Sequence, residues 1–371
     1  MILGVPKEIK THEYRVGMVP AAVKEVVSHG HSVYIETQAG SGIGFSDQDY
    51  IDAGAQILPT AANVFAESEM IVKVKEPQAI ERAMLREGQI LFTYLHLAPD
   101  PAQTEDLIRS KAICIAYETV TDNHGRLPLL APMSEVAGRM SIQAGAFALE
   151  KSRGGRGMLL GGVPGVEPAK VVIIGGGVVG NNAAQMALGL QADVVILDRN
   201  IDVLRQLDVQ FNGKLKTVYS TNDAIERHVL EADLVIGGVL VVGAAAPKLV
   251  TAEMIKKMKP GAAIVDVAID QGGCVATSHA TTHDKPTYIV DDVVHYCVAN
   301  MPGAVARTST VALNNATLPY IVELANNGYQ KALQNNPHLL NGLNVYRGHV
   351  TCKSVAQALD LPYVSAASIL A

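Results

Sequence analysis

The chain has 371 residues, of which 49% are hydrophobic and 18% charged, and this length predicts about two domains with large apolar cores. Its formal net charge of −6 argues against a nucleic-acid partner, because such partners usually require a basic surface. The longest apolar runs, such as residues 234–247, are too short to span a membrane. The amino-terminal residues read as a first strand rather than a signal peptide, so we expect a cytoplasmic protein with no membrane partner.

Short apolar strands alternate with helical stretches along the chain. Before residue 130 the predicted strands are 2–5, 32–36, 70–74, 90–93 and 113–117, with helices such as 21–29 and 101–110 between them. After residue 170 the predicted strands are 171–174, 194–197, 217–219, 234–237, 263–266 and 287–290. This alternation favours parallel sheets that are covered by helices on both faces. The predicted fold class is α/β, with two doubly wound parallel-sheet (Rossmann-like) domains and a cleft between them.

Two helical segments suggest where the domains meet. The segment 134–151 is compatible with a helix, with Ser134 as its N-cap, and a glycine-rich loop follows it. A second helical segment covers 309–327, where Pro319 is expected to introduce a kink. The residues after it are too few for an independent domain of this class, so we expect them to return to the first domain. The predicted division is therefore 1–129 with 307–371 as a substrate domain, and 130–306 as an inserted cofactor domain.

Residues 171–198 read as an apolar strand, a glycine turn, a helix and a second apolar strand that ends in Asp198. The glycines have G-x-G-x-x-G spacing at Gly175, Gly177 and Gly180. Gly175 permits the tight turn, Gly177 lets the backbone approach a pyrophosphate, and Gly180 lets the helix pack close to the sheet. The N-terminus of the helix then offers N–H groups to the phosphates. The pattern therefore predicts a dinucleotide-binding unit.

Asp198 can accept hydrogen bonds from the ribose hydroxyls of an adenosine, and it would repel a 2′-phosphate. The motif thus predicts NAD rather than NADP as the cofactor. Arg199 weakens this preference slightly, because an arginine beside the acid can contact a phosphate. The alternative interpretation is a structural βαβ unit in which the glycines serve only the turn. The four cysteines, which lack zinc-ligand spacing, are expected to be core thiols, and we expect no metal.

Longer motifs occur in order over essentially the whole chain. They are G-V-P-K-E-I-K at 4–10, E-Y-R-V at 13–16, V-K-V-K-E-P at 72–77, F-T-Y-L-H-L at 92–97, L-P-L-L-A-P-M-S-E-V-A-G-R at 127–139, V-D-V-A-I-D-Q-G-G at 265–273 and V-A-N-M-P-G-A-V at 298–305. Together with the glycine turn, they resemble the motifs of bacterial L-alanine dehydrogenases. The resemblance implies oxidative deamination of L-alanine to pyruvate and ammonium with NAD, the reverse reductive amination, and a homohexamer. Hydride would pass between Cα and nicotinamide C4.

The same resemblance implies two substrate-binding cations. Arg15 would bind the amino-acid carboxylate, which a planar guanidinium can do with two parallel hydrogen bonds. From the residues alone, Arg15 would be interpreted as a surface charge. Lys75 would lie against the substrate carboxylate and carbonyl, where a cation stabilises charge that develops on oxygen. In a strand, Lys73 and Lys75 would share a face, and Lys73 is the weaker candidate because it can be structural.

Two further residues are implied to be catalytic. His96 follows an apolar strand, and imidazole is suited to proton transfer near neutral pH. Without the resemblance, a packed or capped histidine would be the ordinary interpretation. Asp270 ends the segment 265–270, where its carboxylate can face the amino group of the substrate. Asp266 lies inside that strand and can be a buried structural acid.

The resemblance also implies a set of cofactor-binding residues in the second domain. They are Ser134, Gly175, Gly177, Val178, Val179, Gly180, Asp198, Ser220, Val239, Leu240, Ile269, Asp270, Asn300 and Met301. One position departs from the family, because residue 203 is often basic there and is Val203 in this chain. A contact that a basic residue 203 would make at the adenosine end of the cofactor is therefore not predicted for this chain.

Three alternative functions remain at this stage. A transhydrogenase-type nucleotide-binding subunit has a related architecture, but it has no need of Arg15, Lys75 and His96 for a small substrate. A dehydrogenase for another substrate, such as glycine or saccharopine, would differ in the size of its pocket, which the sequence does not give. A redox-sensing module would bind NAD without turning over an amino acid.

Overall fold

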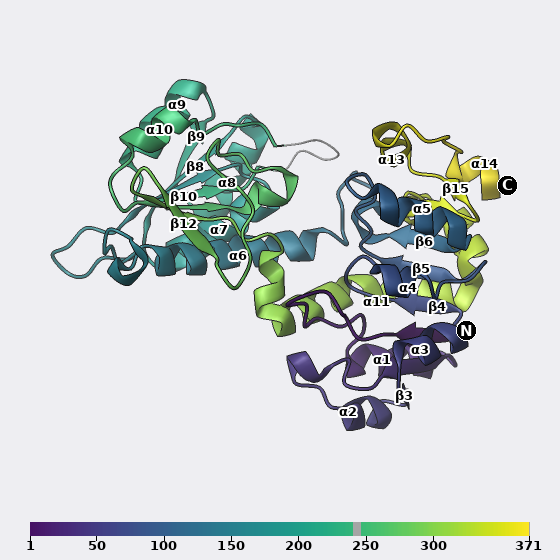
Figure 1. Cartoon of the computed structure of the whole chain (residues 1–371). Coiled ribbons are helices and arrows are strands. Elements are labelled where there is room, and N and C mark those ends of the chain that lie inside the picture. Colours follow the sequence, from purple (N-terminus) through teal and green to yellow (C-terminus); the bar gives the residue numbers. More distant parts are fainter. Residues whose placement is uncertain (240–245, 371) are drawn as a thin grey trace. The chain divides into compact units, whose positions relative to one another are not determined.

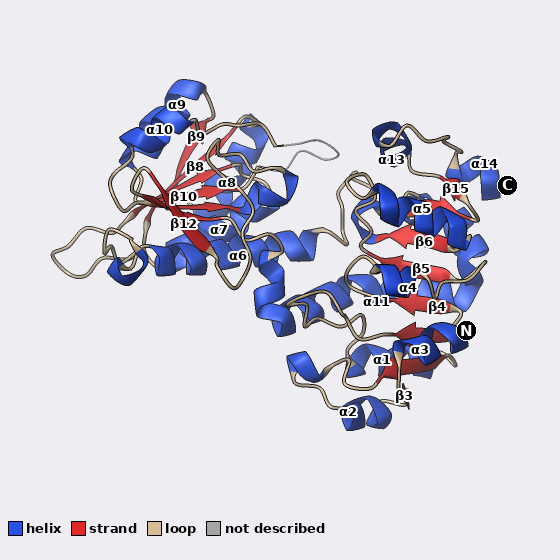
Figure 2. Ribbon diagram, in the orientation of Figure 1, coloured by secondary structure: helices blue, strands red, loops and turns tan. Residues whose placement is uncertain are grey.

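The computed structural model describes residues 1–239 and 246–370. The chain forms two compact α/β units, one made of Met1–Met133 with Val305–Ala371 and the other of Ser134–Ala304. Figure 1 follows the chain through both units, and Figure 2 shows that each contains a sheet with helices beside it. The boundary at residue 133 falls within helix α6 (Ala131–Ala148). We describe each unit by itself.

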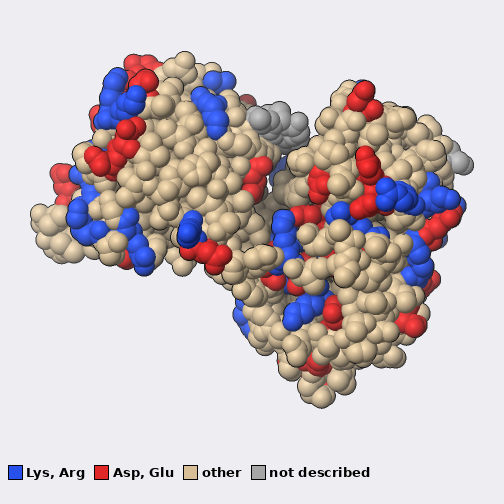
Figure 3. Space-filling model, viewed as in Figure 1, with Lys and Arg blue, Asp and Glu red and all other residues tan. Residues whose placement is uncertain are grey.

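Charged side chains of both signs are interspersed on the visible face of each unit (Figure 3). Among the described residues, no helix has the length and hydrophobicity needed to cross a membrane. Cys114, Cys274 and Cys297 are buried free thiols, and Cys352 is partly exposed. Within residues 1–239 and 246–370, no cluster of histidine, cysteine and acidic side chains could hold a metal ion.

The sheet of the first unit has the strand order β15-β14-β6-β5-β4-β1-β2-β3. Its strands are β1 (Ile2–Val5), β2 (Ser32–Glu36), β3 (Gln56–Leu58), β4 (Met70–Val72), β5 (Ile90–Thr93), β6 (Ile113–Ala116), β14 (Leu343–Tyr346) and β15 (His349–Val350). The strands from β6 to β3 are parallel, as predicted, whereas β14 is antiparallel to both β6 and β15. The prediction of a strand over 70–74 was too long, because β4 ends at Val72.

Helices cover the faces of this sheet. They are α1 (Pro20–Ser28), α2 (Asp47–Asp52), α3 (Ala61–Glu67), α4 (Ala79–Arg82), α5 (Pro101–Ser110), α11 (Ala306–Asn335), α12 (Pro337–Leu340), α13 (Lys353–Ala358) and α14 (Ala366–Leu370), with short 3₁₀ turns η1 (Ser41–Ile43) and η2 (Tyr117–Thr119). The helix α11 contains Pro319 and departs from helical geometry at Gly328 (φ 70°, ψ 157°), and the kink predicted at Pro319 stays a prediction. Glycine adopts such a backbone without steric cost.

The sheet of the second unit has the strand order β12-β13-β11-β10-β7-β8-β9. Its strands are β7 (Lys170–Ile174), β8 (Asp193–Asp198), β9 (Lys216–Tyr219), β10 (Leu234–Gly237), β11 (Ala263–Asp266), β12 (Thr287–Val290) and β13 (Val293–Tyr296). The sheet is parallel except for β12, which forms an antiparallel hairpin with β13. The sequence prediction missed β13 and took the edge strand 287–290 as the last strand of a parallel sheet.

The helical elements of this unit are α6, α7 (Val178–Gly189), α8 (Ile201–Phe211), α9 (Asn222–Glu231) and α10 (Ala252–Lys257), with 3₁₀ segments η3 (Lys151–Arg153), η4 (Val267–Gln271) and η5 (Met301–Val305). The predicted N-cap at Ser134 was wrong, because α6 begins three residues earlier at Ala131. Pro132 then occupies the first turn, where proline needs no intrahelical hydrogen-bond partner.

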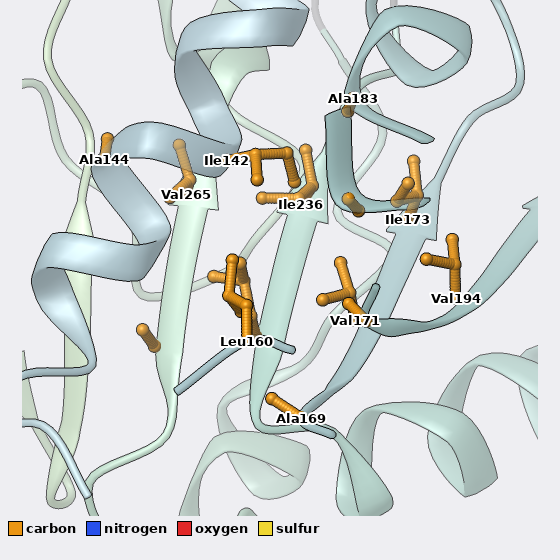
Figure 4. Packing of buried hydrophobic residues seen from close by; sticks show 14 of the residues in the cluster. Ile142, Ala144, Leu160, Ala169, Val171, Ile173, Ala183, Val194, Ile236 and Val265 are labelled. Atoms are coloured by element: carbon orange, nitrogen blue, oxygen red, sulfur yellow. The ribbon is translucent and has the colours of Figure 1, made fainter. Parts of the chain in front are cut away.

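The core of the second unit lies on both faces of its sheet, as expected for a doubly wound fold. On one face Val171 and Ile173 of β7 join a cluster with Ile142 and Ala144 of α6 and with residues of α7 (Figure 4). On the opposite face Val172 and Ile174 pack with residues of α9 and α10. Successive strand residues point to opposite faces, so the apolar run 171–174 needs both layers. The sheet thereby fixes the turn that follows β7.

Candidate active site

The turn between β7 and α7 has the geometry of a phosphate-binding loop. Gly175 has φ +102°, and a Cβ on Gly180 would lie 1.8 Å from the carbonyl oxygen of Gly175, so a side chain there would clash with the backbone. A Cβ on Gly177 would meet no atom within 4 Å. Gly177 is also the N-cap of α7, and no side chain caps this helix N-terminus. The first-turn N–H groups therefore remain suited to bind an anion.

Asp198 lies at the end of β8 beside this turn. Its Oδ2 accepts a hydrogen bond from Gly176 N at 2.6 Å, and its Oδ1 accepts one from Asn200 N at 2.7 Å. The carboxylate is thus held in place, and each oxygen retains a lone pair for a further donor such as a ribose hydroxyl. Val203 packs against the same turn, since a Cβ on Gly176 would lie 2.8 Å from Val203 Cγ1. These residues fit the adenosine and pyrophosphate parts of a dinucleotide.

The other predicted cofactor residues of this unit follow neighbouring parallel strands, whose carboxyl ends lie at one edge of the sheet. Ser220 follows β9 and Val239 follows β10, while Ile269 and Asp270 lie on η4 after β11. Asn300 has φ +64° and precedes the buried Met301 of η5. Further predicted residues lie on α6 and α7, namely Ser134, Val178 and Val179. Leu240 lies outside the described residues.

The turn that carries Asp270 is braced by two charged residues. Asp266 is buried, and its carboxylate accepts hydrogen bonds from Cys274 N at 3.2 Å and Val275 N at 3.1 Å. Lys248 Nζ donates to the carbonyl oxygens of Gly272 and Val275. The structure therefore gives Asp266 the contacts of a buried structural acid, which was one of its predicted interpretations.

In the first unit, Arg15 is buried rather than a surface charge, with 2% of its surface exposed. Its Nε and Nη2 donate to the two carboxylate oxygens of Glu13 at 2.6 and 2.5 Å, and Nη1 lies 3.2 Å from Met133 Sδ. Burial lowers the pKa of Arg15, but the hydrogen bond and charge of Glu13, with smaller contributions from Tyr94 and Glu8, outweigh burial and raise it overall. The guanidinium is therefore a permanent cation, and Glu13 occupies its Nε–Nη2 edge.

The two predicted lysines have different environments. Both follow β4 instead of lying within it, because the strand ends at Val72. Lys73 is fully buried, and its Nζ binds Glu8 at 3.0 Å and Glu81 at 2.7 Å. Lys75 is partly exposed, and its Nζ lies 3.5 Å from Glu76 Oε2. Lys73 thus has the contacts of a structural ion pair, and Lys75 is the lysine that remains accessible to a ligand.

His96 lies three residues after β5 in a left-handed conformation with φ +50°. The carboxylate of Glu118 on η2 accepts hydrogen bonds from His96 N at 2.6 Å and from Leu95 N at 3.2 Å, and its Oε1 is 4.0 Å from His96 Nδ1. The imidazole stacks on Tyr94 with 5.7 Å between ring centroids and 8° between planes. Burial raises the pKa of Tyr94 well above its usual value, so Tyr94 stays neutral.

Sequence reasoning missed four residues that hold these side chains, and they are Glu8, Glu13, Tyr94 and Glu118. All but Glu118 lie within the motifs that carried the resemblance. Glu8 follows the apolar strand 2–5 by three residues, but nothing in the local sequence marks it as buried. Glu118 had no local signal, because the residues that it contacts are 22 and 23 positions away in the sequence.

The second unit has the glycine turn and strand-ending acid of a Rossmann dinucleotide-binding fold. The first unit adds a buried arginine, an accessible lysine and a histidine. These features are typical of a dinucleotide-dependent oxidoreductase of the Rossmann class. Two family models match the chain, the alanine dehydrogenase/PNT N-terminal domain over residues 4–137 and the C-terminal domain over residues 141–353. The chain belongs to the alanine dehydrogenase/PNT family, so the resemblance predicted from its motifs is confirmed. Membership implies a nicotinamide cofactor.

Individual relatives agree with this assignment. The chain is 60% identical to an alanine dehydrogenase of Halomonas elongata and 57% identical to one of Methanococcus maripaludis, with 100% of each chain covered in both cases. A solved L-alanine dehydrogenase is 54% identical with a TM-score of 0.94, and the match covers 97% of this chain and 99% of that one. A transhydrogenase from Sinorhizobium meliloti, 24% identical with a TM-score of 0.81, covers 95% of this chain and 100% of that one and shares the fold. The predicted pair of Rossmann-like α/β domains is confirmed.

Proposed function

We propose that this protein oxidises L-alanine to pyruvate and ammonium with NAD, and that it also catalyses the reverse reductive amination. Full-length identity of 53–60% to relatives named alanine dehydrogenase supports the proposal. The main structural support is the buried guanidinium of Arg15, which is a fixed cation within a folded core. Such a group is suited to bind the carboxylate of a small amino acid.

We assign the substrate to the discontinuous unit and NAD to the unit 134–304. Arg15 would bind the substrate carboxylate through Nη1 and Nη2, and Nη1 would exchange its contact with Met133 Sδ for the substrate. Lys75 would bind the carboxylate and the carbonyl oxygen, and its positive charge would stabilise the charge that develops on oxygen. Together the two cations would set the orientation of Cα before reaction.

His96 would move the protons of the reaction. The nicotinamide, when bound, supplies the acceptor for the Cα hydride. His96 would take a proton from the water that adds to the iminium carbon and return it to nitrogen, and the hydroxyl proton of the resulting carbinolamine would pass to the departing nitrogen as the C–N bond breaks, so that pyruvate and ammonium leave. Asp270 would face the amino group and stabilise its positive charge.

The NAD site would use the predicted residues of the second unit. The N–H groups at Gly177, Val178 and Val179 would bind the pyrophosphate, and Asp198 would accept hydrogen bonds from the adenosine ribose. Ser220 and Val239 would line the adenosine end, and Ile269, Asn300 and Met301 the nicotinamide end. A negative carboxylate at residue 198 would exclude the 2′-phosphate of NADP, which is why we propose NAD.

Assembly and location stay predictions. The motif resemblance implies a homohexamer, and the amino-terminal residues favour a cytoplasmic location. Light scattering coupled to gel filtration would measure the mass of the assembly. A mass other than that of six chains would contradict the hexamer.

The test of the function is NADH formation by the pure protein with NAD and each of L-alanine, glycine, L-serine and saccharopine. Strongest turnover with L-alanine, reversed by pyruvate with ammonium, would support the proposal. Strongest turnover with another amino acid would reassign the substrate. NADH binding without turnover of any amino acid would contradict the assignment and favour a transhydrogenase-type or sensing role.

A further inference from the structure

Glu8 connects the segment after β1 with the segment that carries Lys75. Its carboxylate is buried, with 2% of the side chain exposed. One oxygen, Oε1, accepts hydrogen bonds from Val74 N at 2.7 Å and from Lys75 N at 3.2 Å. The two backbone groups that follow the end of β4 are thus held by an acid 66 and 67 positions earlier in the chain.

The other oxygen of Glu8 explains how a carboxylate is kept in this place. Oε2 accepts a hydrogen bond from Lys73 Nζ at 3.0 Å, and the same ammonium donates to Glu81 at 2.7 Å. Burial raises the pKa of Glu8, while the Lys73 charge opposes this change. Replacing a buried ion pair with apolar side chains is often neutral or stabilising, so stability alone does not account for the presence of Glu8.

The backbone of Lys75 is held on its other side as well. The hydroxyl of Thr93, at the end of the neighbouring strand β5, donates to Lys75 O at 3.0 Å. The segment that carries Arg15 packs against the end of β4, because a Cβ on Gly17 would lie 2.4 Å from Val72 O. Both main-chain polar groups of Lys75 therefore have fixed partners, and its side chain starts from a defined point beside the Arg15 segment.

We propose that Glu8 is a positioning residue that fixes the main chain of Lys75, so that the ammonium group meets the substrate carboxylate and carbonyl. The inference rests on the proposed function, because it takes Lys75 as a substrate contact. Glu8 itself touches no substrate. A shift of the catalytic group by about 1 Å can lower the rate of an enzyme about 10²-fold, so loss of this hydrogen-bonded support should be measurable.

The test is a double-mutant cycle with the full chain, using Glu8→Gln and Lys75→Ala. Glutamine is nearly isosteric, but its amide has one acceptor oxygen where the carboxylate has two, so its NH2 group must face either Lys73 Nζ or the N–H groups of Val74 and Lys75, which are all donors. We expect Glu8→Gln to lower kcat/KM for L-alanine by about 10–10² fold, mostly through KM. In the Lys75→Ala background the same change should lower kcat/KM by less than about threefold, because interacting residues are not additive.

A matched control separates positioning from stability. Glu81→Gln removes the other carboxylate on Lys73 and leaves Lys75 N bound to Glu8, so it should lower the melting temperature but change kcat/KM by less than about threefold. NADH binding, followed by its fluorescence, should stay within about twofold of the parent in each folded variant, because the proposed NAD site lies in the other unit.

The outcomes distinguish the inference from the proposed function. If Lys75→Ala leaves turnover of L-alanine unchanged, the proposed role of Lys75 is wrong, and so is the inference that depends on it. If Lys75→Ala abolishes most turnover but Glu8→Gln has its full effect in that background, Glu8 does not act through Lys75 and the inference is overturned. An unchanged KM in folded Glu8→Gln overturns it as well. If Glu8→Gln fails to fold, hydrogen exchange of the Val74 and Lys75 amides in the parent protein tests the inference instead. Slow exchange would support a fixed segment, and rapid exchange would overturn the inference.

Discussion

Replacement of Asp198 tests how the second unit selects its cofactor. The substitution Asp198→Ala removes the acceptor of two backbone N–H groups. Gly176 is buried, whereas Asn200 is exposed to solvent. A buried donor without a partner costs about 1–3 kcal/mol, whereas water can replace the acceptor at Asn200. Asp198→Ala should therefore destabilise the turn as well as remove the ribose contact.

The ribose contact sets the size of the effect on binding. Hydrogen bonds to a charged acceptor contribute about 1.5–3 kcal/mol, so loss of the carboxylate should raise the Kd for NADH by roughly 10–10² fold. The Kd for NADPH should change much less, because removal of the negative charge also removes the repulsion of the 2′-phosphate. We expect the preference for NADH over NADPH to fall by about tenfold or more.

Asp198→Asn is the matched variant, because its amide oxygen can still accept the hydrogen bond of Gly176 N. It should keep the melting temperature close to the parent value while it relaxes the preference for NADH. Fluorescence titration with both dinucleotides measures the two Kd values. Thermal unfolding measures how much the hydrogen bond from Gly176 N to residue 198 contributes to stability. An unchanged ratio of the two Kd values in both variants would refute the reasoning and show that another residue reads the ribose.

Three further predictions use other parts of the structure. His96→Ala should leave NADH binding within about twofold but lower kcat by about 10²–10⁴ fold, the usual contribution of a general acid–base, and retained turnover in a steady-state assay would contradict the proposed role. Gly180→Ala should abolish NADH binding in a titration, because its Cβ would lie 1.8 Å from Gly175 O, and parent-like affinity would show that the turn can shift at little cost. The hydrogen bond from Arg82 holds the pKa of Asp106 in the folded protein below its usual 3.8. The ion pair therefore stabilises the fold at pH values above 3.8, and this stability is lost as the pH falls through the lowered pKa of the folded state. Asp106→Asn should therefore lower the melting temperature at neutral pH and not in strong acid, and an equal loss at both pH values would contradict the ion pair.

The glycine turn could be predicted from sequence because its parts are local. Gly175, Gly180 and Asp198 lie in one βαβ unit, where spacing and strand order decide which atoms meet. The start of α6 was missed because Ser134 is a good capping residue, although Pro132 had already marked the first turn. Local signals therefore place motifs well and give the ends of helices less reliably.

The acids that hold the proposed substrate site could not be predicted in the same way. Glu8 reaches the end of β4 and Glu118 reaches the end of β5 only after the strands have paired. In the sequence these glutamates resemble ordinary surface residues, because burial and partner choice are properties of the assembled sheet. Arg15 shows the same limit, since from the residues alone it would be interpreted as an exposed charge.

The pairing of β14 with β6 has a consequence for biosynthesis. The Cα partners of Ile113, Cys114 and Ile115 on β6 are residues of β14 between Leu343 and Tyr346, more than two hundred positions later in the chain. A chain made from its amino terminus can complete the unit Ser134–Ala304 while one edge of β6 still lacks its neighbour. Until β14 emerges from the ribosome, that edge is open to pairing with another strand. The first unit to begin synthesis is therefore the last to finish folding.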